Sequence, residues 1–250
     1  SGGTWSGSNA NASIGSTGVV TGVVAGLDTM IYTVTNSCGT ATATKIINVN
    51  PLPNAGTITG ASSVCVGSSI TLTDGVSGGT WSSSNSNASV SAGLVTGLAA
   101  GLVNINYTVS NLCGSVMATH SLTVIPLPNA GTITGVSSVC VGASITLTDA
   151  VIGGTWSSSN ATATIGSTGI VNGVSAGSDT IMYTYTNACG TASTTYSVTV
   201  NPLTVVGSIA GPASGCTGTS ITLSNGVSGG IWTSSKVGFA TAGSASGVVT

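Results

Sequence analysis

Short stretches of the chain alternate apolar and polar residues with a period of two, and the 3.6-residue period of a helix is absent. The stretch 69–73 reads Ser-Ile-Thr-Leu-Thr, and it recurs almost unchanged at 144–148 and at 220–224. Period-two alternation rich in β-branched residues predicts strands that bury one face. A later strand shows the buried face by its apolar positions, which are Met30, Tyr32 and Val34, then Ile105, Tyr107 and Val109, then Ile181, Tyr183 and Tyr185. The positions between them hold mostly Thr, Asn and Ser and are expected to face solvent or a neighbour.

This pattern is part of an internal repeat of about 75 residues. Each of the four tryptophans follows a glycine pair, and they lie 76, 75 and 76 residues apart, at Trp5, Trp81, Trp156 and Trp232. One set of cysteines occurs in Asn-x-Cys-Gly, at Cys38, Cys113 and Cys189. A second set precedes Val-Gly or Thr-Gly, at Cys65, Cys140 and Cys216. A periodic pattern of several independent motifs indicates a repeat architecture.

Prolines at 51, 126 and 202 mark the junctions between repeats. They divide the chain into the C-terminal part of a repeat at 1–50, complete repeats at 51–125 and 126–201, and the N-terminal part of a repeat at 202–250. About seven short strands in 75 residues, separated by turn residues, predict a small antiparallel β-sandwich. We therefore expect an all-β chain of small antiparallel sandwich repeats arranged head to tail.

The motifs resemble those of tandem bacterial immunoglobulin-like repeats of the group-2 type. In the second repeat they are Val-Gly-x-Ser-Ile-Thr-Leu-Thr at 66–73, Gly-Gly-Thr-Trp-Ser-Ser-Ser-Asn at 78–85, and Tyr-Thr-Val-x-Asn-x-Cys-Gly at 107–114. The cysteine-containing, charge-poor form is similar to repeats in long surface proteins of gliding-type bacteria that use a type IX secretion system. The resemblance implies an extracellular or cell-surface location and a role in stalks or adhesive filaments.

Charge is almost missing from the chain, which narrows the possible functions. Two lysines and four aspartates make up 2% of the residues, and there is one histidine, His120. An ordinary soluble domain carries about 25% charged residues. Nucleic-acid binding requires Lys and Arg, and acid–base or metal-assisted catalysis requires clustered titratable groups. The composition therefore predicts that the chain is not an enzyme, has no cofactor or metal and binds no nucleic acid. Mean hydropathy is +0.53, but the apolar runs are too short to insert into a membrane.

Six cysteines in a surface-type repeat predict disulfides. In the immunoglobulin-like order, Cys65 lies before a turn at one end of the sandwich and Cys113 in a hairpin at the other, roughly 25–30 Å away. A bond between repeats, Cys65 with Cys189, is therefore favoured. The runner-up is bonding within repeats, Cys65 with Cys113 and Cys140 with Cys189. Pairing of Cys38 with Cys65 across a junction, and free or interchain thiols, remain open alternatives.

The repeated aromatic residues are predicted to pack in the sandwich cores rather than to bind carbohydrate by stacking. They are Trp5, Trp81, Trp156, Trp232, Tyr32, Tyr107 and Tyr183. Asp74 and Asp149 stand at strand ends and are interpreted as turn formers. Asp28-Thr29-Met30 and Asp179-Thr180-Ile181 resemble the short O-glycosylation motif of the same bacterial group. Thr29 and Thr180 are therefore candidate modification sites.

Two main functions are compatible with these features. The first is a stalk or fibre segment of a secreted surface adhesin, whose partners are the neighbouring repeats of its own chain and which extends a distal binding region from the cell. The alternative is a subunit of a self-assembling extracellular filament or sheath, with lateral packing favoured by the uncharged surface. Direct binding of glycan or ice by threonine-rich faces is a third hypothesis.

Overall fold

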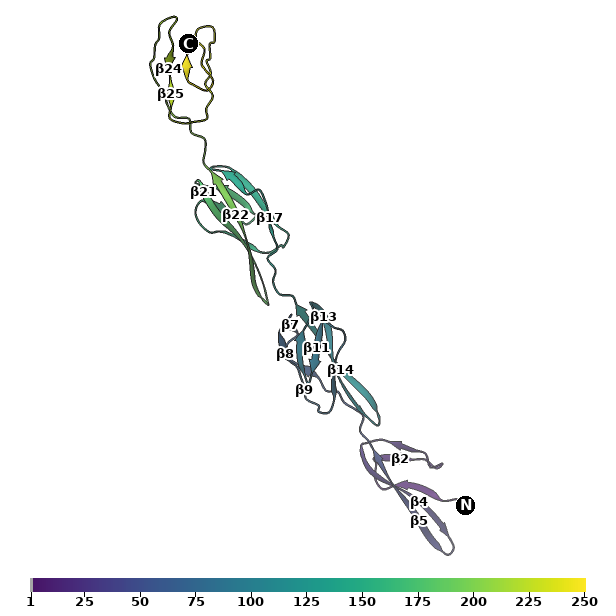
Figure 1. The fold of residues 1–250 in the computed structure, drawn as a ribbon. Helices are drawn as coiled ribbons and strands as arrows, with labels where there is room; N and C mark the ends of the chain where they lie inside the picture. The colour runs from purple at the N-terminus through teal and green to yellow at the C-terminus, as the bar shows by residue number, and fades with distance from the viewer. Residues whose placement is uncertain (1) are drawn as a thin grey trace. The chain divides into compact units, whose positions relative to one another are not determined.

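The computed structural model describes residues 2–250, and this part of the chain contains twenty-six strands and no helix (Figure 1). The chain divides into two compact units. The first runs as far as Pro128 and also includes Thr186–Thr191, and the second comprises Asn129–Tyr185 and the residues from Ala192 onward. The segment Thr186–Thr191 is the tip of a long hairpin whose other residues belong to the second unit.

In the first unit, the repeat at 51–125 is a two-layer β-sandwich. Its first sheet has the order β10 (Thr80–Ser83), β13 (Gly101–Asn111), β14 (Gly114–Ile125) and β7 (Ser63–Cys65). Its second layer consists of β11 (Ala88–Ser91), β12 (Leu94–Gly97) and β8 (Ser69–Thr71), with the short pair β6 (Ile58–Thr59) and β9 (Thr73–Asp74).

Side chains from both layers meet in one core. On β13, Ile105 and Tyr107 are buried while the preceding Asn104 is exposed, as the period-two pattern predicts. The two buried residues pack in the same cluster as Leu72 and Val95 from the opposite layer. The β13–β14 hairpin provides the long central pair, with register from Gly101↔Val124 to Asn111↔Gly114.

One strand pair in each complete repeat runs parallel, which the expectation of an antiparallel sandwich did not include. In the first unit, β7 pairs in parallel with the end of β14, so that Cys65 lies opposite Ile125. The chain leaves β6, which pairs with β9, and then joins the other sheet at β7. This change of sheet occurs without reversing direction, and it places a cysteine at the end of the sandwich.

The remainder of the first unit, before Pro51, has a smaller set of strands. They form the sheet β1 (Thr4–Gly7), β4 (Gly26–Asn36) and β5 (Gly39–Val49), and the pair β2 (Ala12–Ile14) and β3 (Val20–Gly22). Residues 2–50 contain no counterpart of the strands β6 to β9.

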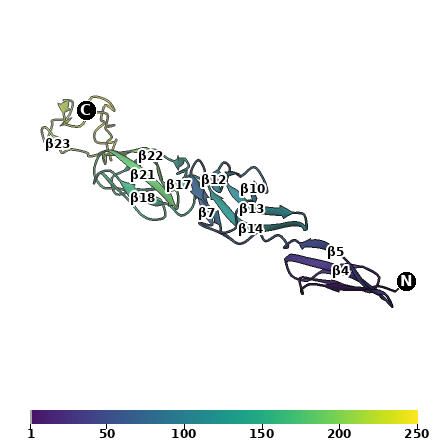
Figure 2. The same ribbon diagram turned by 90° about the horizontal axis from the view of Figure 1, so that it is seen from below.

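In the second unit, the repeat at 126–201 has the same architecture (Figure 2). Its first sheet has the order β16 (Ser138–Cys140), β22 (Gly190–Asn201), β21 (Gly177–Asn187) and β18 (Thr155–Ser158). Its second sheet consists of β15 (Ile133–Gly135), β17 (Ser144–Asp149), β20 (Ile170–Gly173) and β19 (Ala163–Ile165). Ile181 and Tyr183 fill its core, together with Leu147 and Val171.

Residues 202–250 form two short pairs, β23 (Ile209–Ala210) with β25 (Ser224–Asn225) and β24 (Ile221–Thr222) with β26 (Val248–Val249). Large apolar side chains of this segment, such as Ile231 and Phe239, are exposed.

Three tryptophans form tilted pairs with a tyrosine, which explains the glycine two residues before each of them, at Gly3, Gly79 and Gly154. The ring centroids of Trp81 and Tyr107 are 4.8 Å apart. The Tyr107 hydroxyl donates to the Val76 carbonyl at 2.7 Å and accepts from the Gly79 amide at 2.8 Å. A Cβ atom at Gly79 would overlap the Tyr107 ring, so this position has to be glycine.

Burial of the seven predicted core aromatics is uneven. Tyr107 and Tyr183 are buried, and Trp81 and Trp156 are half-buried against the cores. Tyr32 and Trp232 are also half-buried. Trp5 is 37% exposed and is not a core side chain. Its ring still packs against Tyr32, with the ring centroids 4.7 Å apart.

Candidate functional site

The two cysteines of a complete repeat lie at opposite ends of its first sheet. Cys113 is in the turn between β13 and β14, whereas Cys65 ends β7 and lies opposite Ile125, the last residue of β14. Eleven steps along β14 at about 3.3 Å each place roughly 36 Å between these two ends. A disulfide requires Cα atoms within about 7 Å. The runner-up bond between Cys65 and Cys113 is therefore geometrically impossible in this fold.

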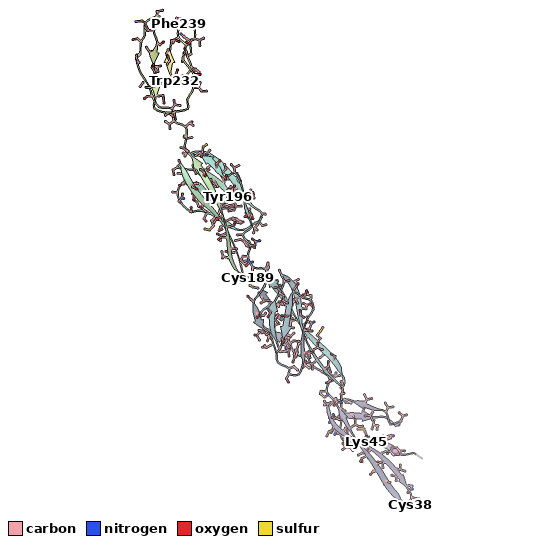
Figure 3. The ribbon with its side chains drawn as sticks, viewed as in Figure 1. Cys38, Lys45, Cys189, Tyr196, Trp232 and Phe239 are labelled. Atoms are coloured by element: carbon pink, nitrogen blue, oxygen red, sulfur yellow. A yellow bond between two sulfur atoms is a disulfide. The ribbon has the colours of Figure 1, made fainter. Side chains whose placement is uncertain are left out.

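Cys65 is joined instead to Cys189. Their Cα atoms are 5.7 Å apart, and 124 residues separate them in the sequence. Cys189 lies at the tip of the β21–β22 hairpin (Figure 3), within the segment Thr186–Thr191 that belongs to the first unit. Neither the Cys140–Cys189 bond nor the Cys38–Cys65 bond is present. Among the described residues, four cysteines are free and exposed, namely Cys38, Cys113, Cys140 and Cys216.

The hairpin tip is shaped by its asparagine and glycine. The side-chain oxygen of Asn187 accepts the Cys189 amide at 2.8 Å, which closes a local turn. Gly190 follows with φ +134, a value that glycine adopts without steric cost. The side-chain nitrogen of Asn187 donates to the Pro126 carbonyl at 3.0 Å. Asn-x-Cys-Gly therefore builds the turn and also attaches it to the junction before the repeat.

The strand-end cysteine is fixed by a second set of backbone contacts. The Val66 amide donates to the Ile125 carbonyl at 2.9 Å, and the Ser68 amide donates to the Cys65 carbonyl at 3.0 Å. Gly67 makes this turn with φ +80. The Cys189 sulfur lies 3.8 Å from the same Ile125 carbonyl oxygen. The last residue of β14 is thus the point at which both cysteines meet.

The free Cys113 occupies an equivalent hairpin tip. The Asn111 side chain accepts the Cys113 amide at 2.8 Å and donates to the Pro51 carbonyl at 2.8 Å. The Cys113 thiol lies 3.6 Å from the Asn50 carbonyl oxygen. Each contact has its counterpart at Cys189, with Pro51 in place of Pro126 and Asn50 in place of Ile125.

The free Cys140, in the second unit, occupies an equivalent strand end. It lies opposite Asn201 in the parallel pair β16–β22. The Val141 amide donates to the Asn201 carbonyl at 3.0 Å, and the Ala143 amide donates to the Cys140 carbonyl at 3.0 Å. These bonds reproduce the surroundings of Cys65, and the Cys140 side chain is exposed.

Two buried carboxylates, which the sequence did not single out as structural, fasten a loop in their own repeats. Asp179 is 1% exposed, and its carboxylate accepts hydrogen bonds from the Ser158 hydroxyl at 2.7 Å, from the Ser159 hydroxyl at 2.9 Å and from the Ala163 amide at 3.0 Å. Asp28 is 1% exposed and accepts the amides of Ser8 and Ala12, both at 3.0 Å. The position corresponds to Val103 in the second repeat, and this polar exception in a buried column was the available signal.

The hydrogen bonds determine the ionisation of these carboxylates. Burial raises the pKa of Asp179, but the Ser158 and Ser159 hydroxyls and the Ala163 amide outweigh it and hold the pKa below its ordinary value. Burial acts in the same direction on Asp28, and the Ala12 amide and the Ser8 hydroxyl again bring the net pKa below its ordinary value. Both groups are therefore carboxylates at neutral pH.

The inward orientation of these aspartates bears on the two candidate glycosylation sites. Thr29 is half-buried and Thr180 is exposed, each on the face of its strand opposite the aspartate. In the folded chain, the aspartate of each Asp-Thr pair is committed to a loop. The threonine hydroxyls remain candidates for modification. The aspartates are explained by their hydrogen bonds to the loop, whether or not the threonines are modified.

Asp149 lines a cavity of about 250 Å³ beside Trp156 and Tyr183. One carboxylate oxygen accepts the Val151 amide at 2.8 Å, which agrees with its interpretation as a turn former. The other oxygen is buried without a hydrogen-bond partner, as is that of Asp74. In residues 2–250 no three His, Cys, Asp or Glu side chains are grouped as metal ligands. These residues also include no helix long and apolar enough to cross a membrane.

Comparison with known proteins identifies no family: no protein-family model and no curated protein matches the chain. Solved structures do match. A titin I-band fragment of domains I67–I69 is 14% identical, over 81% of this chain and 88% of that one, with a TM-score of 0.42. Mouse protocadherin-24 EC1-3 is 15% identical, over 80% and 90%, with a TM-score of 0.36. The S-layer protein rSbsC(31-844) is 18% identical, over 95% and 44%, with a TM-score of 0.29.

The TM-scores of these three matches all lie below 0.5, so the fold class of this chain rests on its own sheets and cores. The sheets and cores described above define an all-β chain of tandem immunoglobulin-like sandwich domains.

Proposed function

We propose that the chain is a structural stalk segment of a secreted bacterial surface adhesin, built from immunoglobulin-like repeats of the group-2 type at 51–125 and 126–201, with partial repeats at 1–50 and 202–250. The observation that carries the proposal is the disulfide between consecutive repeats, Cys65 with Cys189. Its partners are then the neighbouring repeats of its own chain, and its role is to hold a distal binding region away from the cell.

The disulfide has a mechanical consequence that suits such a role. Tension that reaches Cys65 along the chain can cross directly to Cys189, so that the residues between them are excluded from the load. That loop contains most of the repeat at 51–125 and much of the repeat at 126–201. Unfolding either core then cannot lengthen the loaded path through it.

The location follows from the same chemistry. Disulfides persist in oxidising compartments and are rare in the cytosol. A disulfide between repeats, together with the resemblance to type IX-secreted repeats, supports an extracellular position on the cell surface. The low charge also leaves few sites for proteases that cleave at Lys, Arg or Glu, since only Lys45 and Lys236 are present.

The exposed strand faces favour an alternative, a filament or sheath that packs laterally. Leu102 on β13 is 72% exposed and Met117 on β14 is 56% exposed, with little charge nearby to oppose association. Sedimentation velocity of the oxidised chain over a range of micromolar concentrations separates the two. A concentration-independent monomer is expected for the stalk, and reversible growth into long oligomers would favour the filament.

A further inference from the structure

We propose that the Cys65–Cys189 bond is one instance of a general docking rule, in which the strand-end cysteine of a repeat receives the hairpin-tip cysteine of the next repeat in the chain. We call the strand-end cysteine the acceptor and the hairpin-tip cysteine the donor. Under this rule, the acceptor Cys140 bonds the tip cysteine of a following repeat, and the donor Cys113 bonds the strand-end cysteine of a complete preceding repeat. The inference deepens the stalk proposal, on which it rests, by naming the partner of these two thiols.

The donor half is complete at Cys113. Its tip is attached to the preceding junction by the same asparagine contact as the Cys189 tip, 2.8 Å to the Pro51 carbonyl against 3.0 Å to the Pro126 carbonyl. Its sulfur is 3.6 Å from the Asn50 carbonyl, against 3.8 Å from the Ile125 carbonyl for Cys189. The tip is therefore docked before any disulfide forms.

Cys113 differs from Cys189 in one respect: no strand carrying an acceptor cysteine lies beside it. In the formed joint, β7 runs parallel to the end of β14 and presents Cys65 beside Ile125. Within residues 2–50, β5 has β4 as its partner and no strand pairs with it in parallel. The open end of β5 fits a Ser-Val-Cys strand, which would bring a cysteine next to the Asn50 carbonyl.

The acceptor half is complete at Cys140. The strand β16 is paired with the end of β22, and the turn after Cys140 is closed as it is after Cys65. Cys140 cannot reach the tip cysteine of its own repeat, because β22 separates them just as β14 separates Cys65 from Cys113. An Asn-x-Cys-Gly hairpin from a following repeat is the partner that fits.

Bond formation is a two-electron oxidation. Two thiols lose two protons and two electrons to a disulfide oxidant, which leaves as two thiols, and one sulfur–sulfur bond forms in the chain. Glutathione disulfide supplies this chemistry in vitro and a disulfide-carrying oxidoreductase supplies it in an oxidising compartment.

The rule predicts interlocking loops along an array. Each tip cysteine precedes the next strand-end cysteine by 27 residues, as in 38–65, 113–140 and 189–216. Each bond would close a loop like the present one of 124 residues, which is longer than the repeat period, so successive loops overlap. Every folded core would then lie inside at least one covalent loop.

Duplicating residues 126–201 in place, within the full chain, tests the acceptor. The proline that begins each repeat is retained at the new boundary, and the chain gains two cysteines. After refolding with glutathione disulfide, we expect a bond from Cys140 of the first copy to Cys189 of the second, beside the original Cys65–Cys189 bond. The number of free thiols then stays at four, as in the parent chain.

Duplicating residues 51–125 tests the donor independently, in case the first insertion does not fold. Here Cys65 of the first copy is expected to bond Cys113 of the second, while Cys65 of the second copy bonds Cys189. Peptide mapping after chymotryptic digestion without reduction identifies the pairs. As a matched control, Cys140→Ser in the first copy of the 126–201 duplication should free one additional thiol, raising the count to five.

Three results would overturn the rule: six free thiols in either duplicated chain, a bond within one copy, or disulfide-linked dimers on non-reducing gels. None of these would by itself contradict the stalk function, which sedimentation of the parent chain tests separately. Conversely, lateral oligomers with the expected disulfide pairing would support the docking rule and contradict the stalk function.

Discussion

The Cys113 thiol lies 3.6 Å from the Asn50 carbonyl oxygen, in the same relation that the disulfide-bonded Cys189 has to Ile125. Two joints of the same design thus occur in one chain, one closed by a disulfide and one not. The common element is the Asn-x-Cys-Gly tip, which attaches to the preceding junction through the asparagine side chain.

Removing the disulfide should lower the stability of the sandwich at 51–125 far more than removing a free thiol. In the chain-entropy model a loop of 124 residues contributes about 5 kcal/mol. We expect Cys65→Ser to shift guanidinium unfolding to lower concentration by a corresponding amount, under non-reducing conditions. Cys113→Ser is the matched control and should change it little. Equal effects of the two substitutions would contradict a stabilising role for the bond.

Asp179→Asn should destabilise the repeat at 126–201. The carboxylate oxygen that accepts the Ser158 hydroxyl and the Ala163 amide would be replaced, in one orientation of the amide, by a donor facing donors. Leaving such groups unpaired costs about 2–3 kcal/mol. Hydrogen exchange of the Ala163 amide reports the loss directly, and unchanged protection would show that the loop does not depend on this carboxylate.

The depressed pKa values of Asp28 and Asp179 predict acid sensitivity. Because the folded-state pKa lies below the unfolded value of about 3.9, the carboxylate contributes stability that is fully present above that value. The contribution is lost as the pH falls below about 4 through the folded pKa. Unfolding midpoints should therefore drop as the pH falls below about 4 in the parent chain, and less steeply in Asp179→Asn. Parallel profiles would contradict this origin.

Asp149→Asn should be neutral or stabilising, in contrast to the substitution at Asp179. One Asp149 oxygen is buried without a partner. Asn225 occupies the corresponding position in 202–250, where it accepts the Val227 amide at 2.8 Å and donates to the Gly207 carbonyl at 2.7 Å. The same bonds made by an asparagine side chain at position 149 would add about 0.5–1 kcal/mol. Thermal unfolding measures the difference, and clear destabilisation would show that the Asp149 charge has a role of its own.

The alternation of apolar residues was sufficient to predict the strands and the buried face of β13. Successive side chains of a strand point to opposite faces, so the positions of Ile105 and Tyr107 follow from the local sequence. The parallel pairing of β7 with β14 was not predictable, since a three-residue strand such as Ser63–Cys65 has no pattern that indicates its direction.

The sequence reduced the number of plausible disulfide pairings but did not determine which one forms. Spacing alone indicates that Cys65 and Cys113 occupy opposite ends of a sandwich, whereas the docking of Asn187 on Pro126 requires tertiary structure. The role of Asp179 was hidden for a similar reason, because its partners Ser158 and Ala163 come from a loop 16 to 21 residues earlier.

Single-molecule stretching of the chain, held at its two ends, tests the proposed load path most directly. With the Cys65–Cys189 bond intact, complete unfolding should leave the 124-residue loop out of the final extension. Reduction should then lengthen the fully unfolded chain by about 410–450 Å, at about 3.3–3.6 Å per residue. Equal final lengths in oxidising and reducing buffer would contradict the account, because tension would then pass through the repeats without crossing the disulfide.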